Sequence, residues 1–265
     1  MNVFKVISPT NKEIPFILSI PHSGTSIPNE KVDFFNKKQL NLMDDTDWFL
    51  DKLYDFAPEM GITTVIANYH RWVVDLNRDP NNQPLYSDGR IITSICPITN
   101  FNGKNIYNDN YQLDKKEISS RVASYFSPYH VFLNSLIEKF LNTHSKVILW
   151  DGHSIKRFVP TINSNKFPDL IIGNNDHQSC QKELTKIAFD SLKKSTYEVQ
   201  MNHPFKGGYI TRFHGNPNKG INSIQLEMSK DLYMSEDETI YDENKANKIQ
   251  ELLKSTFQEL IEKLS

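Results

Sequence analysis

"IPFILSIPHSGTS", residues 14–26, is the stretch that decides the fold, because a mostly apolar run ends there in Pro21-His22-Ser23-Gly24. A continuous apolar run bounded by turn-forming residues is typical of a strand covered on both faces. A second stretch, "KVILWDGHSIK" at 146–156, has the same form, and in it His153 precedes Ser154. In an open α/β sheet, ligands bind at the carboxyl ends of the strands. The two stretches therefore predict that both imidazoles lie at one edge of a sheet.

Strands and helices alternate on either side of these two stretches. Apolar runs predict strands at 14–20, 61–67, 71–75, 146–151, 169–172, 208–212 and 221–228. Apolar residues at helical spacing predict helices at 47–57, 115–143, 177–194 and 244–264. Asp114 and Glu117 resemble a capping box, and we expect Pro128 to kink or split its helix. The alternation predicts an α/β fold, a three-layer sandwich in which helices flank a central mixed, mostly parallel sheet.

The length of the chain fits one domain. We expect residues 1–265 to form a single domain, with a lid or specificity loop at 80–112. That segment is rich in Asn, Pro and Gly, and structureless loops of this length in compact domains are usually functional.

The composition excludes several classes of protein. Hydrophobic residues make up 38% and charged residues 23% of the chain, as in soluble globular proteins. A formal net charge of −2 offers no electrostatic footprint for nucleic acid. Cys96 and Cys180 form no CxxC pair, which favours a reducing compartment. Without a signal peptide or a span-length apolar run, we expect a cytoplasmic protein that binds neither membrane nor nucleic acid. The sequence carries no signal for an oligomeric state.

The histidines suit a metal site. Imidazole is the commonest protein ligand of Zn²⁺, and a catalytic zinc typically takes three protein ligands. The alternative is that His22 and His153 each bond a nearby carbonyl at a strand end. A third ligand is expected in "MDDTDWF" at 43–49, where Asp47 is preferred and Asp45 is second. Acidic residues also favour helix N-termini, so capping would by itself explain this cluster.

Glu227 is a candidate general base. Period-two alternation in "INSIQLEM" places Ser223, Gln225 and Glu227 on one face of a strand. A carboxylate at the end of the sheet can take a proton from a metal-activated water. The alternative is a solvent-facing glutamate on an edge strand.

Arginines indicate an acidic small molecule as ligand. "HRWVVDLNRD" at 70–79 contains Arg71, Asn77 and Arg78, and guanidinium groups bind carboxylates through two parallel hydrogen bonds. The alternative is an Arg–Asp surface pair. In "HPFKGGYITRFHG" at 203–215, Arg212 follows two glycines that would let the backbone approach a ligand closely.

Two other functions fit parts of the sequence. "GHSIK" at 152–156 resembles the G-x-S-x-G nucleophile elbow, with Lys156 in place of the second glycine. In a serine hydrolase Ser154 would attack, and His203 or His214 would complete a triad. That function leaves His22 and the acidic cluster without a role. A non-catalytic module that binds acids through the arginines is the third possibility.

Six motifs along the chain resemble the N-formylglutamate amidohydrolase (N-formylglutamate deformylase) family. In chain order they are "SIPHSGTSIP", "DDTDWFLDKLYDFA", "RWVVDLNRDPNNQPLY", "LWDGHSIKR", "PFKGGYITR" and "IQLEMSKDLYM". The family is grouped with zinc-carboxypeptidase-like and aspartoacylase-like amidohydrolases, whose fold is a mixed sheet between helices, of the zinc-exopeptidase (phosphorylase/hydrolase-like) type. The resemblance implies hydrolysis of N-formyl-L-glutamate to formate and L-glutamate, a step of histidine degradation.

The resemblance also implies roles for individual residues. His22 and His153 match histidines that hold the metal, and Glu227 matches the general base. Leu76-Asn77-Arg78 matches a segment that binds the substrate carboxylate, and Arg71 is placed to polarise the scissile carbonyl. Relatives in the wider group usually carry an acidic ligand three residues after the first histidine.

This chain has Thr25 at that position, so we expect Asp47 to complete a site for Zn²⁺ or another divalent metal. We also expect Arg212 to help bind the carboxylates of a small acidic N-acyl amino acid, and Asp151 to orient a ligand imidazole. A related acyl or acid preference remains an alternative.

Overall fold

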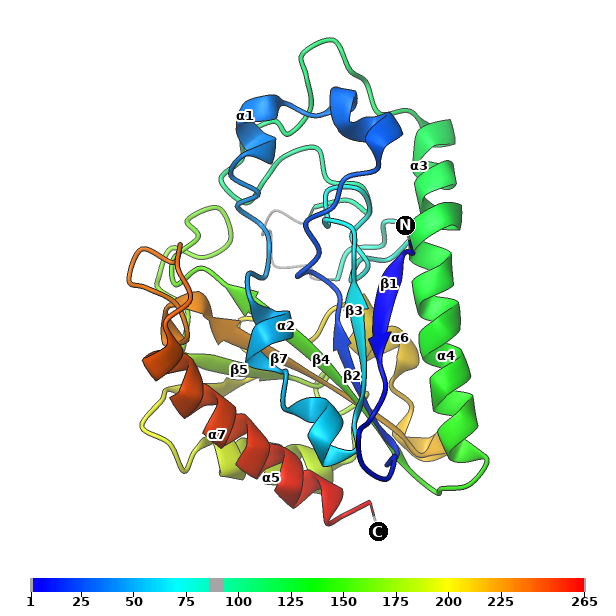
Figure 1. The fold of residues 1–265 in the computed structure, drawn as a ribbon, viewed down its shortest axis with the longest axis vertical. Coiled ribbons are helices and arrows are strands. Elements are labelled where there is room, and N and C mark those ends of the chain that lie inside the picture. The colour runs from blue at the N-terminus through cyan, green and yellow to red at the C-terminus, as the bar shows by residue number, and fades with distance from the viewer. Residues whose placement is uncertain (1, 86–92, 265) are drawn as a thin grey trace.

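The computed structural model describes residues 2–85 and 93–264, and its centre is a seven-stranded mixed sheet (Figure 1). The spatial order of the strands is β1-β3-β2-β4-β7-β5-β6. Their bounds are Phe4–Ile7 (β1), Phe16–Ile20 (β2), Thr63–Ala67 (β3), Val147–Ile155 (β4), Leu170–Gly173 (β5), Val199–Met201 (β6) and Ile221–Ser229 (β7). Strands β3, β2, β4 and β7 are parallel, whereas β1 pairs with β3 and β5 with β7 in antiparallel fashion. The predicted mixed, mostly parallel sheet is confirmed.

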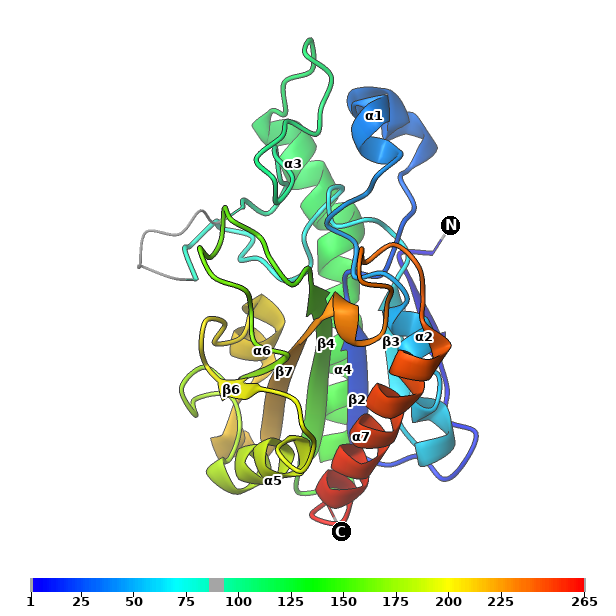
Figure 2. The ribbon, with the colours of Figure 1, turned by 90° about the vertical axis from the view of Figure 1, so that its left-hand side faces the viewer.

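Helices cover both faces of the sheet and make three layers. One face carries α3 (Lys115–Arg121), α4 (Ser127–Leu141) and α6 (Tyr209–His214). The other carries α2 (Leu50–Leu53), α5 (Lys182–Leu192) and α7 (Glu243–Ile261). In Figure 2, α4 lies behind the sheet and α7 in front of it. The short α1 (Lys37–Leu40) lies above the sheet, at the top of Figure 1.

Two separate cores follow from the period of two in the strands. In β4, Val147 and Leu149 join the core under α4, whereas Ile148 and Trp150 join the core under α5 and α7. Both sets are fully buried. A strand covered on both faces is mostly apolar on both, which is why residues 147–150 read as a continuous rather than an alternating run, and the buried polar residues of β4 follow at its carboxyl end. The predicted interior strands at 14–20 and 146–151 are confirmed.

Two predicted strands are wrong. Residues 208–212 lie at the start of α6, and 71–75 form turns. The second segment is apolar because Trp72 packs in a small core with Phe35 and Tyr107. Its carbonyls are satisfied by a side chain rather than by a neighbouring strand, since Arg121 Nη1 donates to Trp72 O and Val73 O at 3.4 and 3.2 Å. The short strands β1 and β6, at the two edges of the sheet, were missed.

The long helix predicted at 115–143 is split, as Pro128 indicated. A π-helical segment, η3 (Val122–Phe126), separates α3 from α4. Pro128 lies at the start of α4 and has no N–H to donate to the preceding turn. Asp114 accepts a hydrogen bond from the backbone of Glu117 at 2.7 Å, but the Glu117 carboxylate accepts from Lys31 and Arg121 rather than returning to Asp114. Only half of the predicted capping box therefore forms.

Two of the other predicted helices begin later than expected, whereas α7 begins at Glu243, one residue before the predicted start, and ends at Ile261, three residues before the predicted end. The 47–57 prediction is reduced to α2, followed by the 3₁₀ turn η2 (Ala57–Met60), and α5 begins five residues after position 177. Three more 3₁₀ turns are η1 (Asn29–Phe34), η4 (Pro217–Lys219) and η5 (Lys230–Leu232). Within the described ranges, no helix is long and apolar enough to cross a bilayer.

Candidate active site

A cavity of about 390 Å³ opens at the carboxyl edge of the central strands. Most of the residues predicted for the site line it: His22, Asp47, Arg71, Asn77, Arg78, His153 and Glu227. Arg212 is the exception. Its Nε donates to Gly207 O at 2.8 Å, and it is not among the described residues that line the cavity. The structure therefore brings together side chains from β4, β7 and three loops but leaves Arg212 aside.

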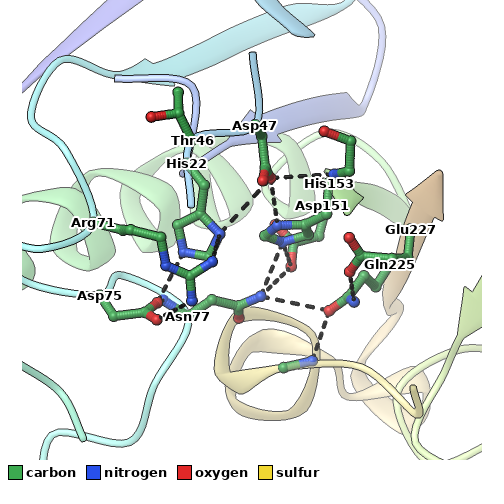
Figure 3. Close-up of polar contacts among 12 residues, drawn as sticks. His22, Thr46, Asp47, Arg71, Asp75, Asn77, Asp151, His153, Gln225 and Glu227 are labelled. Atoms are coloured by element: carbon green, nitrogen blue, oxygen red, sulfur yellow. Dashed lines mark hydrogen bonds and ion pairs between the residues drawn. The ribbon is translucent and has the colours of Figure 1, made fainter. Parts of the chain in front are cut away.

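His22 follows β2 and is held by a carboxylate. Its Nε2 lies 2.8 Å from Asp75 Oδ1, while its Nδ1 lies 3.8 Å from Asp47 Oδ2 and 3.3 Å from Arg71 Nη1 (Figure 3). Burial, together with the charge of Arg71, lowers the pKa of His22 to about 4. The ring is therefore neutral at physiological pH, and its Nδ1 faces the cavity.

His153 repeats this arrangement from β4. Its Nε2 lies 3.0 Å from Asp151 Oδ2, and its Nδ1 lies 3.2 Å from Asp47 Oδ2 (Figure 3). Although burial acts in the opposite direction, the carboxylates of Asp151 and Asp47 hold the pKa of His153 well above its ordinary value. Both rings thus have Nε2 tied to an aspartate and Nδ1 facing one carboxylate oxygen of Asp47.

Asp47 and Asp45 have different surroundings although both are buried. Asp47 donates its backbone N–H to His22 O at 3.0 Å, and its Oδ2 accepts from the backbone of Ser154 at 3.2 Å. Asp45 instead accepts from Trp72 Nε1 and from the backbone of Phe101 at 2.7 and 2.9 Å. Asp45 therefore fastens a loop, and Asp47 is the acidic residue that faces the two imidazoles.

The donor set of His22, Asp47 and His153 fits a divalent metal ion. The potential ligand atoms all lie within 4.8 Å of one another, and all three residues are buried. Metal-ligating histidines typically give their other ring nitrogen to a carboxylate, as both rings do here with Asp75 and Asp151. Two imidazoles and one carboxylate suit Zn²⁺ and also other first-row metals.

Glu227 lies beside His153 across the sheet. The two residues are paired in register on β4 and β7, so their side chains share a face. Strand β7 lies between β4 and β5, which rules out an exposed edge position. Gln225 Nε2 donates to Glu227 Oε2 at 3.2 Å, and burial raises the pKa of Glu227 to about 8. The carboxyl group is thus suited to accepting and returning a proton near neutral pH.

Asn77 is fixed from several sides. Its Oδ1 accepts from the backbone of Ile210 at 2.7 Å, and its Nδ2 donates to Asp151 Oδ2 at 3.2 Å. A Cβ added at Gly208 would lie 2.4 Å from the Asn77 amide, so this glycine is required for the close approach. The asparagine therefore connects the start of α6 with the second carboxylate behind His153.

Two guanidinium groups border the cavity. Arg71 is buried, its Nη2 lies 2.5 Å from Asp75 Oδ2, and the Phe101 ring lies 4.7 Å from its Cζ. Arg78 Nη1 donates to Asn77 O at 3.3 Å, and its side chain is 21% exposed. The pair provides positive charge that suits an anionic ligand.

Ser154 does not have the geometry of a nucleophile elbow. It lies inside β4, which continues to Ile155, rather than at a sharp turn between strand and helix. Its hydroxyl lies 2.7 Å from the Tyr233 hydroxyl, and His214 is bonded to His130 instead. Among the described residues, no histidine hydrogen-bonds the Ser154 side chain.

Several residues that line or support the cavity were given no role from the sequence. Asp75 stands inside a motif that was singled out, and Gln225 shares the face of Glu227, so pattern could have found both. Phe101, Thr161 and Phe205 also line the cavity, but they come from loops without periodicity. Only the packing of those loops over the sheet edge brings them there.

We expect Gly208→Ala to disturb the site through Asn77. The new methyl group overlaps the Asn77 amide, which its other hydrogen bonds prevent from moving freely. Overpacking of this kind costs about 1–3 kcal/mol, so denaturant unfolding should show that loss. Gly103→Ala is a contrasting variant rather than a neutral control: the new Cβ meets nothing within 4 Å, but the φ of +75° strains an alanine there, so it reports backbone strain without overlap. An unchanged free energy of unfolding in Gly208→Ala would contradict the close packing.

Comparison with known proteins shows the family to which the chain belongs. A model of the N-formylglutamate amidohydrolase family matches residues 14–234. The N-formylglutamate deformylase of Pseudomonas aeruginosa is 34% identical over 233 residues, which cover 88% of this chain and 86% of that protein. The N-formylglutamate deformylase of Pseudomonas putida is 33% identical over 259 residues, covering 97% and 96%.

Solved structures agree. The N-formylglutamate amidohydrolase of Ralstonia eutropha has a TM-score of 0.82 at 25% identity, covering 100% of this chain and 98% of its own. A protein of Agrobacterium tumefaciens shares the fold with a TM-score of 0.77 at 18% identity, covering 98% and 95%. The fold and the polar site define an α/β amidohydrolase. More narrowly, the chain belongs to the N-formylglutamate amidohydrolase family.

Proposed function

We propose that this chain hydrolyses N-formyl-L-glutamate to formate and L-glutamate with the help of a divalent metal ion. The observation that supports this most is the convergence of His22 Nδ1 and His153 Nδ1 on Asp47, with Glu227 in register beside His153. The names of the relatives supply the substrate. The cavity, bordered by two guanidinium groups, suits a small acidic amide.

In this proposal His22, Asp47 and His153 hold Zn²⁺ or another divalent metal. When bound, the ion supplies Lewis acidity that activates water and polarises the formyl carbonyl. Asp75 and Asp151 hold the two rings through Nε2, which leaves both Nδ1 atoms facing Asp47, where they would be available to a metal ion. With a divalent ion bound, two neutral imidazoles and one carboxylate would leave one net positive charge on the ion and its ligands, and His153, whose pKa is raised in the metal-free structure, would have to release its proton to bind the ion.

Glu227 moves the proton. Its carboxylate takes a proton from the attacking water as the new C–O bond forms at the formyl carbon. It then returns that proton to the amide nitrogen as the C–N bond breaks, so formate and a free amine leave. A pKa of about 8, raised by burial, keeps both protonation states accessible near neutral pH.

Arg71 and Arg78 have different roles in this proposal. Arg71, fixed by Asp75, stabilises the negative charge that develops on the carbonyl oxygen. Arg78, with Asn77 beside it, binds substrate carboxylate. Arg212 is left out of this set because it does not line the cavity.

The expectations for the domain, the long loop and the localisation are part of the same proposal. Residues 1–265 are a single amidohydrolase domain, and the segment 80–112 covers the site. Thr93, Asn100 and Phe101 from this segment line the cavity, whereas residues 86–92 fall outside the described ranges. Both cysteines are free and buried, which agrees with a reducing compartment such as the cytoplasm. The role in histidine degradation rests on the resemblance to the family.

Formate release tests the proposed function directly. N-formyl-L-glutamate should be cleaved faster than N-acetyl-L-glutamate and N-formyl-L-aspartate, and a chelator should abolish turnover. Zn²⁺ added back should restore it. A serine-reactive phosphonate should leave turnover unchanged, because Ser154 is bonded to Tyr233 in a continuous strand. Turnover that survives exhaustive chelation but not the phosphonate would establish the serine hydrolase instead.

Arg78→Ala should raise the KM for N-formyl-L-glutamate by about 10- to 100-fold with a small change in kcat. A charge-assisted hydrogen bond contributes about 1.5–3 kcal/mol, and the loss affects binding of the carboxylate rather than the reacting bond. The internal control is an uncharged N-formyl amide, whose kcat/KM should change little. If both substrates lose equally, Arg78 does not bind the carboxylate.

A further inference from the structure

The loop that carries Asp47 is fastened by the segment that follows Glu227. Asp47 lies outside any helix or strand, between Thr46 and Trp48. Lys230 Nζ donates to Thr46 O at 2.6 Å, and the Tyr233 hydroxyl donates to Trp48 O at 3.0 Å. The carbonyls on both sides of Asp47 are therefore held from η5 and the residue directly after it.

Lys230 is unusual in its burial. Its residue is 3% exposed, and among residues 2–85 and 93–264 it forms no ion pair. Burying an ammonium group without a carboxylate in contact is costly, and the hydrogen bond from Nζ to Thr46 O offsets part of that cost. Lys156 also lies close to the acidic segment, but it has a carboxylate partner and is partly exposed. Its Nζ bonds Asp44 at 3.1 Å, and 35% of its side chain is exposed.

The hydroxyl of Tyr233 links the same clamp to the opposite wall of the site. It lies 2.7 Å from Ser154 Oγ, and the Ser154 backbone N–H donates to Asp47 Oδ2. His70 Nε2 lies 2.9 Å from Thr46 Oγ1 and adds a neutral contact. Of the side chains that bond Thr46, Trp48 or Ser154 here (Lys230, Tyr233 and His70), only Lys230 carries an ammonium group.

We propose that Lys230, assisted by Tyr233, is a positioning residue that holds the Asp47 carboxylate against His22 and His153 and thereby sets the affinity of the site for a divalent metal ion. This inference rests on the metal site of the proposed function. Without Nζ, the Thr46 carbonyl loses its buried donor and turns toward another one, which moves the adjacent carboxylate. One of the three proposed metal ligands is then displaced, and the metal ion is bound less tightly.

The test is Zn²⁺ affinity, measured on folded apoprotein by competition with a chromophoric chelator. Lys230→Met keeps an unbranched side chain as far as the ε position and removes the donor and charge, and should weaken Zn²⁺ binding at least about tenfold. Tyr233→Phe removes only a neutral hydroxyl and should weaken it about two- to fivefold. Lys156→Met is the matched control and should stay within about twofold of the wild type, because charge on an exposed pair is screened.

A double-mutant cycle separates positioning from general stability. In an Asp47→Asn background, Lys230→Met should have little further effect on Zn²⁺ affinity, because the ligand it positions is already removed. Additive losses would overturn the inference, and so would wild-type affinity in Lys230→Met. If Lys230→Met does not fold, wild-type Zn²⁺ affinity in Tyr233→Phe overturns it. If Asp47→Asn itself binds Zn²⁺ normally, the proposed ligand set is what fails.

Discussion

Glu227→Gln should reduce kcat for formate release by about 10³-fold, within the range that general acid–base catalysis contributes. The amide keeps the size of the side chain and can still bond Gln225, but it cannot take a proton from water. Because Glu227 is not among the three residues that face one another as ligands, bound Zn²⁺ should remain near one equivalent. The measurement is steady-state kinetics together with metal content of the same preparation.

Two results would remove Glu227 from the mechanism. Retention of more than about a tenth of wild-type kcat is too much for the loss of a general base. Loss of the metal together with activity would make Glu227 a ligand or a support for one. Glu259→Gln is a suitable control, since that glutamate lies on the far end of α7 and bonds Lys194 and Ser191.

His153→Ala should abolish turnover and weaken Zn²⁺ binding by at least about 100-fold, since even loss of a supporting outer residue costs 10- to 100-fold. The variant removes one of two imidazoles and leaves the buried carboxylates of Asp47 and Asp151 without their shared partner. Metal analysis after gel filtration and chelator competition give the affinity, and formate release gives the activity.

The same variant should also lose stability in the metal-free state. A buried carboxylate that loses its charged partner is strongly destabilising, by up to about 3–5 kcal/mol for a broken buried pair, and the hydrogen bonds that Asp47 and Asp151 keep to Ser154 and Asn77 place the expected loss at the lower end. His144→Ala is the control, because His144 is exposed at the end of α4 and its ring bonds only neighbouring residues. Normal Zn²⁺ content in His153→Ala would contradict the ligand set.

Local pattern predicted the interior of the fold well and its periphery poorly. The runs at 14–20 and 146–151 were recognisable as strands because a strand buried on both faces is apolar at nearly all positions. The run at 71–75 is apolar at its three central positions but forms turns, since the buried guanidinium of Arg121 satisfies the carbonyls of Trp72 and Val73. Arg121 is distant in sequence, so no local pattern can reveal that partner.

The site shows the same division. Period-two alternation placed Gln225 and Glu227 on one face of β7, and both line the cavity. Whether that strand was interior or exposed depended on its position between β4 and β5. Asp45 and Asp47 are chemically identical in the sequence, and only their different partners distinguish them.

By itself, the sequence determined the α/β class, the buried strands and the residue types available for metal, proton and carboxylate chemistry. It could do so because burial and strand period are written into neighbouring positions. The tertiary structure decided which aspartate faces the two imidazoles, that Arg212 lies aside, and that Lys230 holds the Asp47 loop. Those outcomes depend on contacts between segments far apart in the chain, and such contacts form only when the loops pack over the edge of the sheet.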